Sequence, residues 1–207
     1  MNNFDRIAPI YDKLVNMVFG KAMRRAQTKF LKEIRDHSRV LILGGGTGWL
    51  LEELLSLRPE CQVTYIDASK KMTNMARKRI DNRHNVAFIH GTEKEIPTTS
   101  LFEVVITHFY LDLFSERSCH ETCDIIRNHC RAGSLWIACD FVDRAWWHSA
   151  MLKIMYAFFK VTARLHTKSL PDWRTCIQES GFKEIGVSYY SGDFICSALY
   201  RLETGQK

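Results

Sequence analysis

The chain has 207 residues, of which 46% are hydrophobic and 25% charged, and its formal net charge is +6 at pH 7. This length favours one domain, residues 1–207, and is sufficient to bury a hydrophobic core. The basic residues are dispersed and no apolar run reaches the roughly 18 residues of a membrane span, so the composition argues against a basic nucleic-acid-binding tail and a transmembrane segment.

The sequence has seven cysteines, and this odd number argues against a disulfide framework. It has no Cys-x-x-Cys pair, which argues against a zinc ribbon. Cys119, Cys123 and Cys130 do lie near His120 and His129. Cysteines four apart on a predicted helix are nevertheless typical of buried structural thiols, and we expect no metal site. Free thiols, together with a start that has no apolar leader segment, indicate a cytoplasmic protein.

Apolar residues recur at steps of three and four over residues 4–20 and 21–35, which predicts an N-terminal helical cap interrupted at Pro9. The run 40–43 is short and apolar, as expected of a strand buried on both faces. The glycines at 44–46 and 48 permit positive φ and let a ligand approach the backbone closely. A helix over 48–57 directs its free N–H groups at this loop, so the unit predicts a nucleotide-type site.

The next strand is predicted at 62–66 and leads into Asp67, about 20 residues past the loop, where a carboxylate is suited to bind ribose hydroxyls. Ser69 is suited to cap a helix over 70–81. Further strands are predicted at 86–89, 104–107 and 135–139, with a helix over 116–129 and a turn at 131–133. This alternation indicates a parallel sheet with right-handed crossovers.

Residues 142–168 are expected to form a helical insertion after the fifth strand, because they are rich in apolar residues and contain no glycine or proline. One interpretation is a wall or lid for an apolar acceptor. The alternatives are a core helix, a homodimer interface or a peripheral membrane contact helped by nearby lysines and arginines. Pro171 and Asp172 then open another helix, and 183–190 and 194–201 predict a hairpin across 191–193.

The glycine spacing separates two ligand classes. Dinucleotide enzymes favour G-x-G-x-x-G, whereas here the glycines fall as G-x-G-x-G at Gly44, Gly46 and Gly48. This spacing, followed by Asp67, resembles the class I S-adenosylmethionine-dependent methyltransferases. Three later segments are similar to that family's motifs, and the Tyr11-Asp12 pair resembles its ubiquinone/menaquinone-type branch. The three segments are Asp67–Met72 (acid-x-S-x-x-M), Gly91–Pro97 (G-D-A-x-x-L-P) and Phe102–Val105 (F-D-x-V).

The resemblance covers most of residues 4–141 and implies a fold and a cofactor. The fold would be an α/β, three-layer Rossmann-like sandwich. Its seven-stranded, mostly parallel sheet would have the order 3-2-1-4-5-7-6, with a C-terminal antiparallel hairpin. The cofactor would be S-adenosyl-L-methionine, and the acceptor a small, apolar or aromatic molecule such as a quinone precursor or lipid. The implied cofactor-binding residues are Tyr11, Gly44, Gly46, Gly48, Asp67, Ala68, Met72, Thr92, Glu93 and His108.

His108, after the fourth strand, and Asp140, at the end of the fifth, are candidates for acid–base work on the acceptor. Two residues depart from the family pattern, since Ile42 and Thr92 stand where many members have an acid. These departures keep open a cofactor-binding module without catalysis. The positive charge keeps open an RNA or protein methyltransferase, although arginine and lysine are not clustered with aromatic residues.

Overall fold

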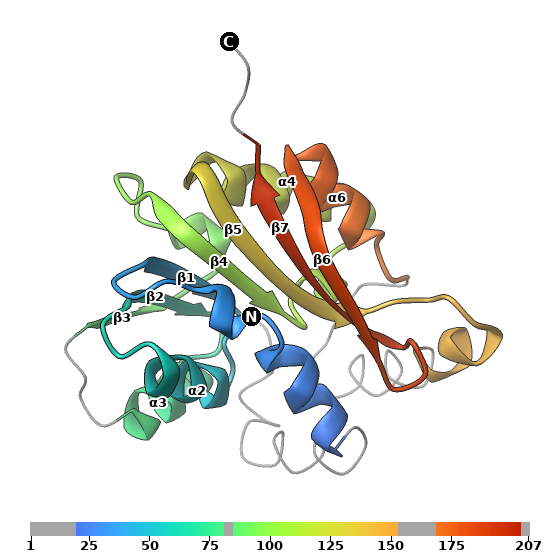
Figure 1. The fold of residues 1–207 in the computed structure, drawn as a ribbon, viewed down its shortest axis with the longest axis horizontal. Coiled ribbons are helices and arrows are strands. Elements are labelled where there is room, and N and C mark those ends of the chain that lie inside the picture. The colour runs from blue at the N-terminus through green and yellow to red at the C-terminus, as the bar shows by residue number, and fades with distance from the viewer. Residues whose placement is uncertain (1–19, 81–84, 153–168, 204–207) are drawn as a thin grey trace.

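The computed structural model describes residues 20–80, 85–152 and 169–203. Seven strands form one sheet in the order β3-β2-β1-β4-β5-β7-β6 (Figure 1). The first five of these pair in parallel, and β7 runs antiparallel to both β5 and β6, which confirms the predicted order and hairpin. The strands are β1 (Arg39–Leu43), β2 (Gln62–Asp67), β3 (Val86–His90), β4 (Phe102–His108), β5 (Cys130–Phe141), β6 (Phe182–Tyr190) and β7 (Ile195–Leu202).

Four α-helices with complete bounds connect these strands, together with three 3₁₀ turns. The helices are α2 (Trp49–Leu57), α3 (Lys70–Arg79), α4 (Glu116–Asn128) and α6 (Trp173–Glu179). The 3₁₀ turns are η1 (Leu31–Glu33), η2 (Glu93–Glu95) and η3 (Leu111–Leu113). Residues 20–28 and 146–152 are also helical. Ser69 caps α3 by accepting a hydrogen bond from the Met72 N–H, as predicted.

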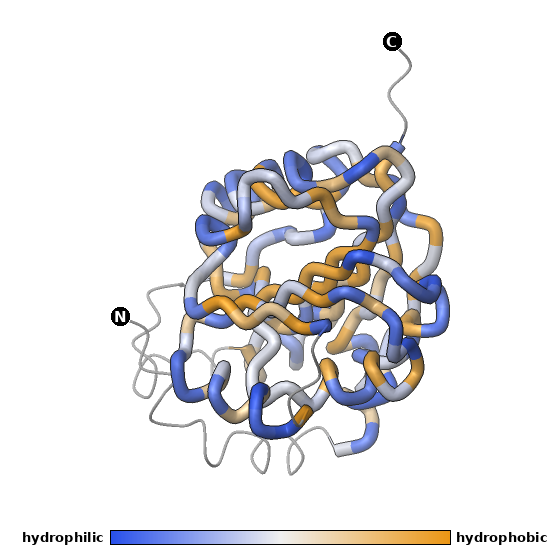
Figure 2. Tube along the Cα trace, turned by 90° about the vertical axis from the view of Figure 1, so that its left-hand side faces the viewer, coloured by the Kyte–Doolittle hydropathy of each residue, from blue (hydrophilic) through white to orange (hydrophobic). Residues whose placement is uncertain are grey.

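The alternation of side chains along each strand places helices on both faces of the sheet. In β1, Leu41 and Leu43 face the cluster that contains α4 and α6 residues, whereas Val40 and Ile42 face the cluster that contains α2 and α3 residues. Figure 2 shows the resulting apolar strands in the middle of the molecule, between helices with hydrophilic outer surfaces. The structure is therefore the predicted three-layer α/β sandwich.

Three local expectations need correction. The helix predicted over 21–35 ends at residue 28 and is followed by η1, which places Leu31 and Ile34 in the core. The predicted turn at 131–133 is part of β5. There the register shifts, so that Phe102 pairs with Cys130 but Val104 pairs with Leu135.

The helix predicted from residue 142 begins at 146, because the Val142 N–H still bonds to the Phe194 carbonyl beside the sheet. The rest of that predicted helix, residues 153–168, and the first predicted helix at 4–19 lie outside the described residues. Among the described helices, none has the length and apolar character needed to cross a membrane.

Candidate functional site

The glycine loop joins the end of β1 to α2 at the carboxyl edge of the sheet (Figure 1). Gly44, Gly46 and Gly48 adopt φ values of +65°, +65° and +83°, a region that side chains other than glycine rarely enter. At Gly48 a Cβ would lie 2.6 Å from the Cα of Ala76, so this glycine also allows α2 to pack against α3. Among the residues that the structure describes, none has an atom within 4 Å of a Cβ placed at Gly46, so this part of the chain leaves the loop open there.

Asp67 lies directly across from this open part of the loop. Its Oδ2 accepts a hydrogen bond of 2.8 Å from the Gly46 N–H, and its Oδ1 accepts one of 2.8 Å from the Ser69 N–H. These two backbone donors hold the carboxylate beside the glycine loop, as the sequence predicts. Open backbone next to an acceptor-only carboxylate fits the ribose of a nucleoside cofactor, whose hydroxyls are donors.

Tyr65 packs against the glycine loop and forms a hydrogen bond to it, and the sequence analysis did not predict this contact. Its hydroxyl donates a 2.7 Å hydrogen bond to the Gly46 carbonyl, and its ring passes so close to Gly45 that a Cβ there would lie 2.1 Å from Cε2. The close approach of the Tyr65 ring therefore requires glycine at position 45. The available signal was the position of Tyr65 two residues before the acid on β2.

The two residues predicted for the adenine end are engaged elsewhere in the protein. The Thr92 hydroxyl accepts a hydrogen bond from the Lys94 N–H, and the Glu95 carboxylate accepts one from the Thr92 N–H. Thr92 and Glu95 therefore form a capping box at the start of η2. The Glu93 carboxylate is 5% exposed and accepts a 2.8 Å hydrogen bond from the Tyr110 hydroxyl. Contact of either side chain with a cofactor stays a prediction.

The remaining predicted cofactor residues differ in accessibility. Ala68 is exposed beside Asp67, whereas Met72 is buried in α3. Ile42 is buried in the core between β1 and α2 rather than at the site. Tyr11 lies outside the described residues, so its predicted contact is untested.

His108 ends β4 and is 6% exposed. Among the described residues neither ring nitrogen has a hydrogen-bond partner, which leaves two buried polar atoms next to the carboxyl edge of the sheet. Burial lowers the pKa of His108 to about 3, so the ring is neutral at physiological pH. Phe109 follows with φ of +51°, a strained conformation for a bulky residue at the point where the chain leaves β4.

Asp140 holds the loop after β4 against the end of β5. Its Oδ2 accepts hydrogen bonds of 3.1 and 3.2 Å from the N–H groups of Leu111 and Asp112, and its Oδ1 accepts one from the Phe141 N–H. The side chain is 1% exposed, so these contacts make it a structural clamp. Its role as a catalytic base stays a prediction.

Asp112 is the titratable neighbour of Asp140 that the sequence analysis missed. Burial raises the pKa of Asp112 from 3.8 to about 7, and burial together with the charge of Asp112 raises the pKa of Asp140. Because three N–H donors favour the ionised form of Asp140, and Oδ1 of Asp112 has no partner among the described residues, we place the proton of this pair on Asp112. A carboxyl that titrates near neutrality is suited to proton transfer.

A cavity of about 590 Å³ adjoins the carboxyl end of β5. Its wall is apolar along one part and carries two arginines along another. Arg144 lies over the Tyr189 ring at 4.5 Å, and Arg174 donates to the Tyr189 hydroxyl at 3.0 Å and pairs with Glu184. The lining residues are Phe141, Val142, Asp143, Arg144, Ser149, Leu152, Ser169, Leu170, Pro171, Asp172, Trp173 and Arg174.

Comparison with known proteins shows similarity to methyltransferases. Residues 40–133 match the family model described as a methyltransferase domain. The chain is 28% identical over 113 residues to a malonyl-[acyl-carrier protein] O-methyltransferase of Halalkalibacterium halodurans, covering 51% of this chain and 42% of the relative. It is 31% identical over 122 residues to a demethylmenaquinone methyltransferase of Thermotoga maritima, covering 56% of this chain and 51% of the relative.

These alignments span about half or less of the length of the relatives. Among solved structures, the fold is similar to a chain from the structure described as the complex between the Haloferax volcanii Trm112 methyltransferase activator and "the putative methyltransferase". That similarity has a TM-score of 0.76 at 13% identity, over 99% of both chains. At such low identity the likeness supports the fold alone.

Proposed function

We propose that this chain, a class I S-adenosylmethionine-dependent methyltransferase by its domain and fold, methylates a small acceptor with an apolar or aromatic body. A quinone precursor or a lipid-like molecule meets that description. The observation that carries the proposal is the open backbone of Gly46 beside the Asp67 carboxylate, at the edge of the sheet that the β4 and β5 ends share.

The glycine loop and Asp67 would hold the nucleoside part of the cofactor. Asp67 would accept hydrogen bonds from the ribose hydroxyls, and Gly46 would let the sugar approach the backbone without meeting a side chain. Ala68, exposed beside Asp67, would border the adenine. When bound, S-adenosylmethionine supplies an electrophilic methyl group on a sulfonium, so the protein has to align donor and acceptor rather than perform difficult chemistry.

Two groups near the ends of β4 and β5 are candidates for removing a proton from the methyl acceptor. The neutral ring of His108 offers hydrogen bonding without charge, but a pKa of about 3 makes it a weak base. Burial raises the pKa of Asp112 to about 7, so above that pH its carboxylate is the stronger candidate proton acceptor. The clamp of Asp140 on the Leu111 and Asp112 N–H groups fixes the position of this pair.

The cavity at the end of β5 is our candidate for the acceptor site. Its volume of about 590 Å³ lies in the range that small ligands occupy, roughly 300–1,000 Å³. Phe141, Leu152 and Trp173 supply apolar wall, and Arg144 supplies a cation for an acidic or hydroxyl-bearing substituent. The relative named demethylmenaquinone methyltransferase supports an acceptor of the quinone type.

The test is transfer of labelled methyl groups from S-adenosylmethionine to a panel of phenols, hydroquinones and fatty-acyl esters. Ser149 lines the cavity from the helical residues 146–152, so Ser149→Trp should fill part of the cavity. We expect this variant to raise the KM for the acceptor at least tenfold while leaving the Kd for S-adenosylmethionine unchanged. Leu101→Trp, at an exposed position outside the cavity lining, is the matched control.

Two results would overturn parts of this proposal. Tight binding of S-adenosylmethionine with no transfer to any acceptor class would favour the binding module without catalysis. Equal acceptor KM values for the wild type and Ser149→Trp would remove the cavity from the acceptor site while leaving the methyltransferase assignment intact.

A further inference from the structure

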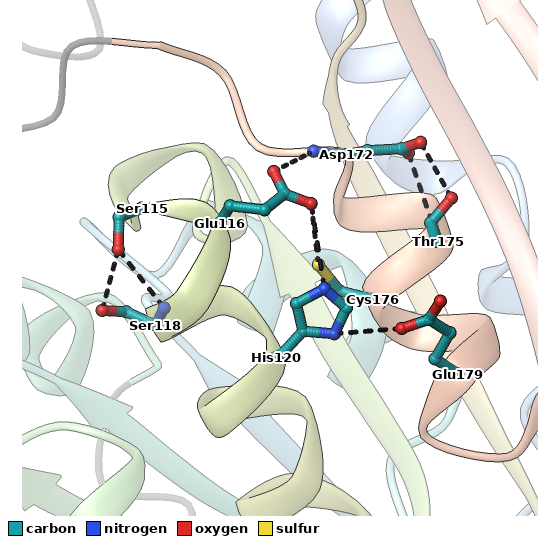
Figure 3. A network of polar contacts seen from close by, with 8 residues as sticks. All are labelled: Ser115, Glu116, Ser118, His120, Asp172, Thr175, Cys176 and Glu179. Carbon is teal, nitrogen blue, oxygen red and sulfur yellow. Dashed lines mark hydrogen bonds and ion pairs between the residues drawn. The ribbon is translucent and has the colours of Figure 1, made fainter.

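Helices α4 and α6 lie side by side on one face of the sheet and bring together four side chains that the methyltransferase chemistry does not use (Figures 1 and 3). Glu116 and His120 are four residues apart on α4, and Cys176 and Glu179 are three residues apart on α6. Residues at these spacings lie on the same face of a helix. Each pair therefore faces the neighbouring helix.

Three of these residues offer ligand atoms at one point. The Oε1 of Glu116 lies 3.8 Å from Nε2 of His120 and 3.9 Å from Sγ of Cys176. All three ligand atoms lie within 4.8 Å of one another. In a tetrahedral zinc site with bonds of about 2.0–2.3 Å, neighbouring ligand atoms are roughly 3.3–3.8 Å apart. Side-chain movements of up to about 1 Å bring this trio from separations of at most 4.8 Å to that geometry.

The fourth residue, Glu179, orients the imidazole. Its Oε2 lies 3.5 Å from Nδ1 of His120, on the opposite side of the ring from Glu116 (Figure 3). Histidines that bind metals usually donate their second N–H to a carboxylate, which fixes the ring and makes the ligating nitrogen more basic. Glu179 has the position of that supporting carboxylate, so the cluster contains a ligand trio and its outer partner.

The carboxylate of Glu116 is also held in place. Its Oε2 accepts a 2.9 Å hydrogen bond from the Asp172 N–H at the start of α6, which leaves Oε1 directed at His120 and Cys176. Cys176 is buried at its position on α6, and Glu116 and His120 are partly exposed, so an ion can reach the trio from solvent. The trio is therefore pre-organised and leaves a fourth coordination position for water.

The geometry points to a zinc-type site formed by Glu116, His120 and Cys176, with Glu179 as the supporting carboxylate. The mixed oxygen, nitrogen and sulfur set favours Zn²⁺, and disfavours Mg²⁺ and Ca²⁺, which prefer oxygen alone. Such an ion would fasten α4 to α6. It would also fix Asp172, which belongs to the cavity wall.

The test uses the full, reduced, metal-free chain and Co²⁺ as a spectroscopic probe that Zn²⁺ then displaces. We expect one equivalent of Co²⁺ with tetrahedral d–d absorption and a thiolate-to-cobalt charge-transfer band. His120→Asn and Cys176→Ser should remove that band. Glu179→Gln should keep it but weaken binding about 10- to 100-fold, the usual effect of losing a supporting partner. Zn²⁺ should raise the Tm of the wild type and not that of His120→Asn.

The chain supplies matched controls for each ligand type. Glu121→Gln is on α4 but its carboxylate pairs with Arg117, and Cys130→Ser changes another buried cysteine, on β5. Both should bind Co²⁺ as the wild type does. No charge-transfer band in the wild type, or a band that survives in His120→Asn, would overturn the proposal. Because His120 is partly exposed, its variant tests the site even if Cys176→Ser does not fold.

Discussion

The buried carboxyl pair of Asp112 and Asp140 makes the stability of the protein depend on pH in a direction that can be measured. Folding raises the pKa of Asp112 from 3.8 to about 7 because the group is desolvated. Because the folded protein holds this proton more tightly than the unfolded chain does, the protonated carboxyl stabilises the fold at a pH below the unfolded pKa. This stabilisation is lost as the pH rises through the folded-state pKa. The window of loss therefore runs from about pH 4 to about pH 7.

The magnitude follows from the pKa displacement. Each pKa unit corresponds to about 1.4 kcal/mol, so the change from 3.8 to about 7 corresponds to at most about 4 kcal/mol. Roughly a third of this loss has occurred at pH 5 and nearly all of it at pH 8. Asp112→Asn cannot ionise, so its stability relative to the wild type should improve by about 2–3 kcal/mol between pH 5 and pH 8.

Urea denaturation of both proteins at the two pH values measures this difference. Any constant cost of placing an amide at position 112 cancels, because only the change with pH is compared. Asp124→Asn, on the exposed side of α4, is the control and should show a much smaller change. An Asp112→Asn effect that is equal at both pH values, or that reverses, would refute the assignment of the shared proton.

Two further substitutions test the loop and its surroundings by the same denaturation assay. Gly48→Ala should lower the free energy of unfolding by about 2–4 kcal/mol, because its Cβ would lie 2.6 Å from Ala76 and φ is +83°. Gly46→Ala should lower it by only about 1–2 kcal/mol, because no described residue lies within 4 Å of the added Cβ. Equal costs would contradict the described packing. Tyr110→Phe should cost about 1–3 kcal/mol, since it leaves the buried carboxylate of Glu93 without its hydroxyl donor, and an unchanged unfolding midpoint would show that this bond contributes nothing.

Local patterns were sufficient to predict the main elements, whereas the order of the strands in the sheet came from the family resemblance. The apolar run of β1 followed by glycines is a short-range signal, and so are the acid at the end of β2 and the Ser69 cap. The position of Asp67 beside the loop followed from these signals, because the ends of adjacent parallel strands meet at one edge of the sheet.

The parts that could not be predicted depend on contacts between distant segments. Asp112 and Asp140 are 28 residues apart and Glu116 and Cys176 are 60 residues apart, so no local spacing shows that they meet. The capping box at Thr92 is local, with Glu95 three residues later. The Thr-x-x-Glu spacing is itself the sequence signature of a capping box, so this contact was predictable from the sequence.

The proposed function depends on binding of the S-adenosylmethionine nucleoside by the open loop at Gly46 and the carboxylate of Asp67. Calorimetric titration of S-adenosylmethionine into the wild type and Asp67→Asn measures this binding. We expect one site in the wild type and binding weakened by about 1.5–3 kcal/mol, roughly 10- to 150-fold, in folded Asp67→Asn. No binding by the folded wild type at about 1 mM, or equal affinity in the two proteins, would contradict it.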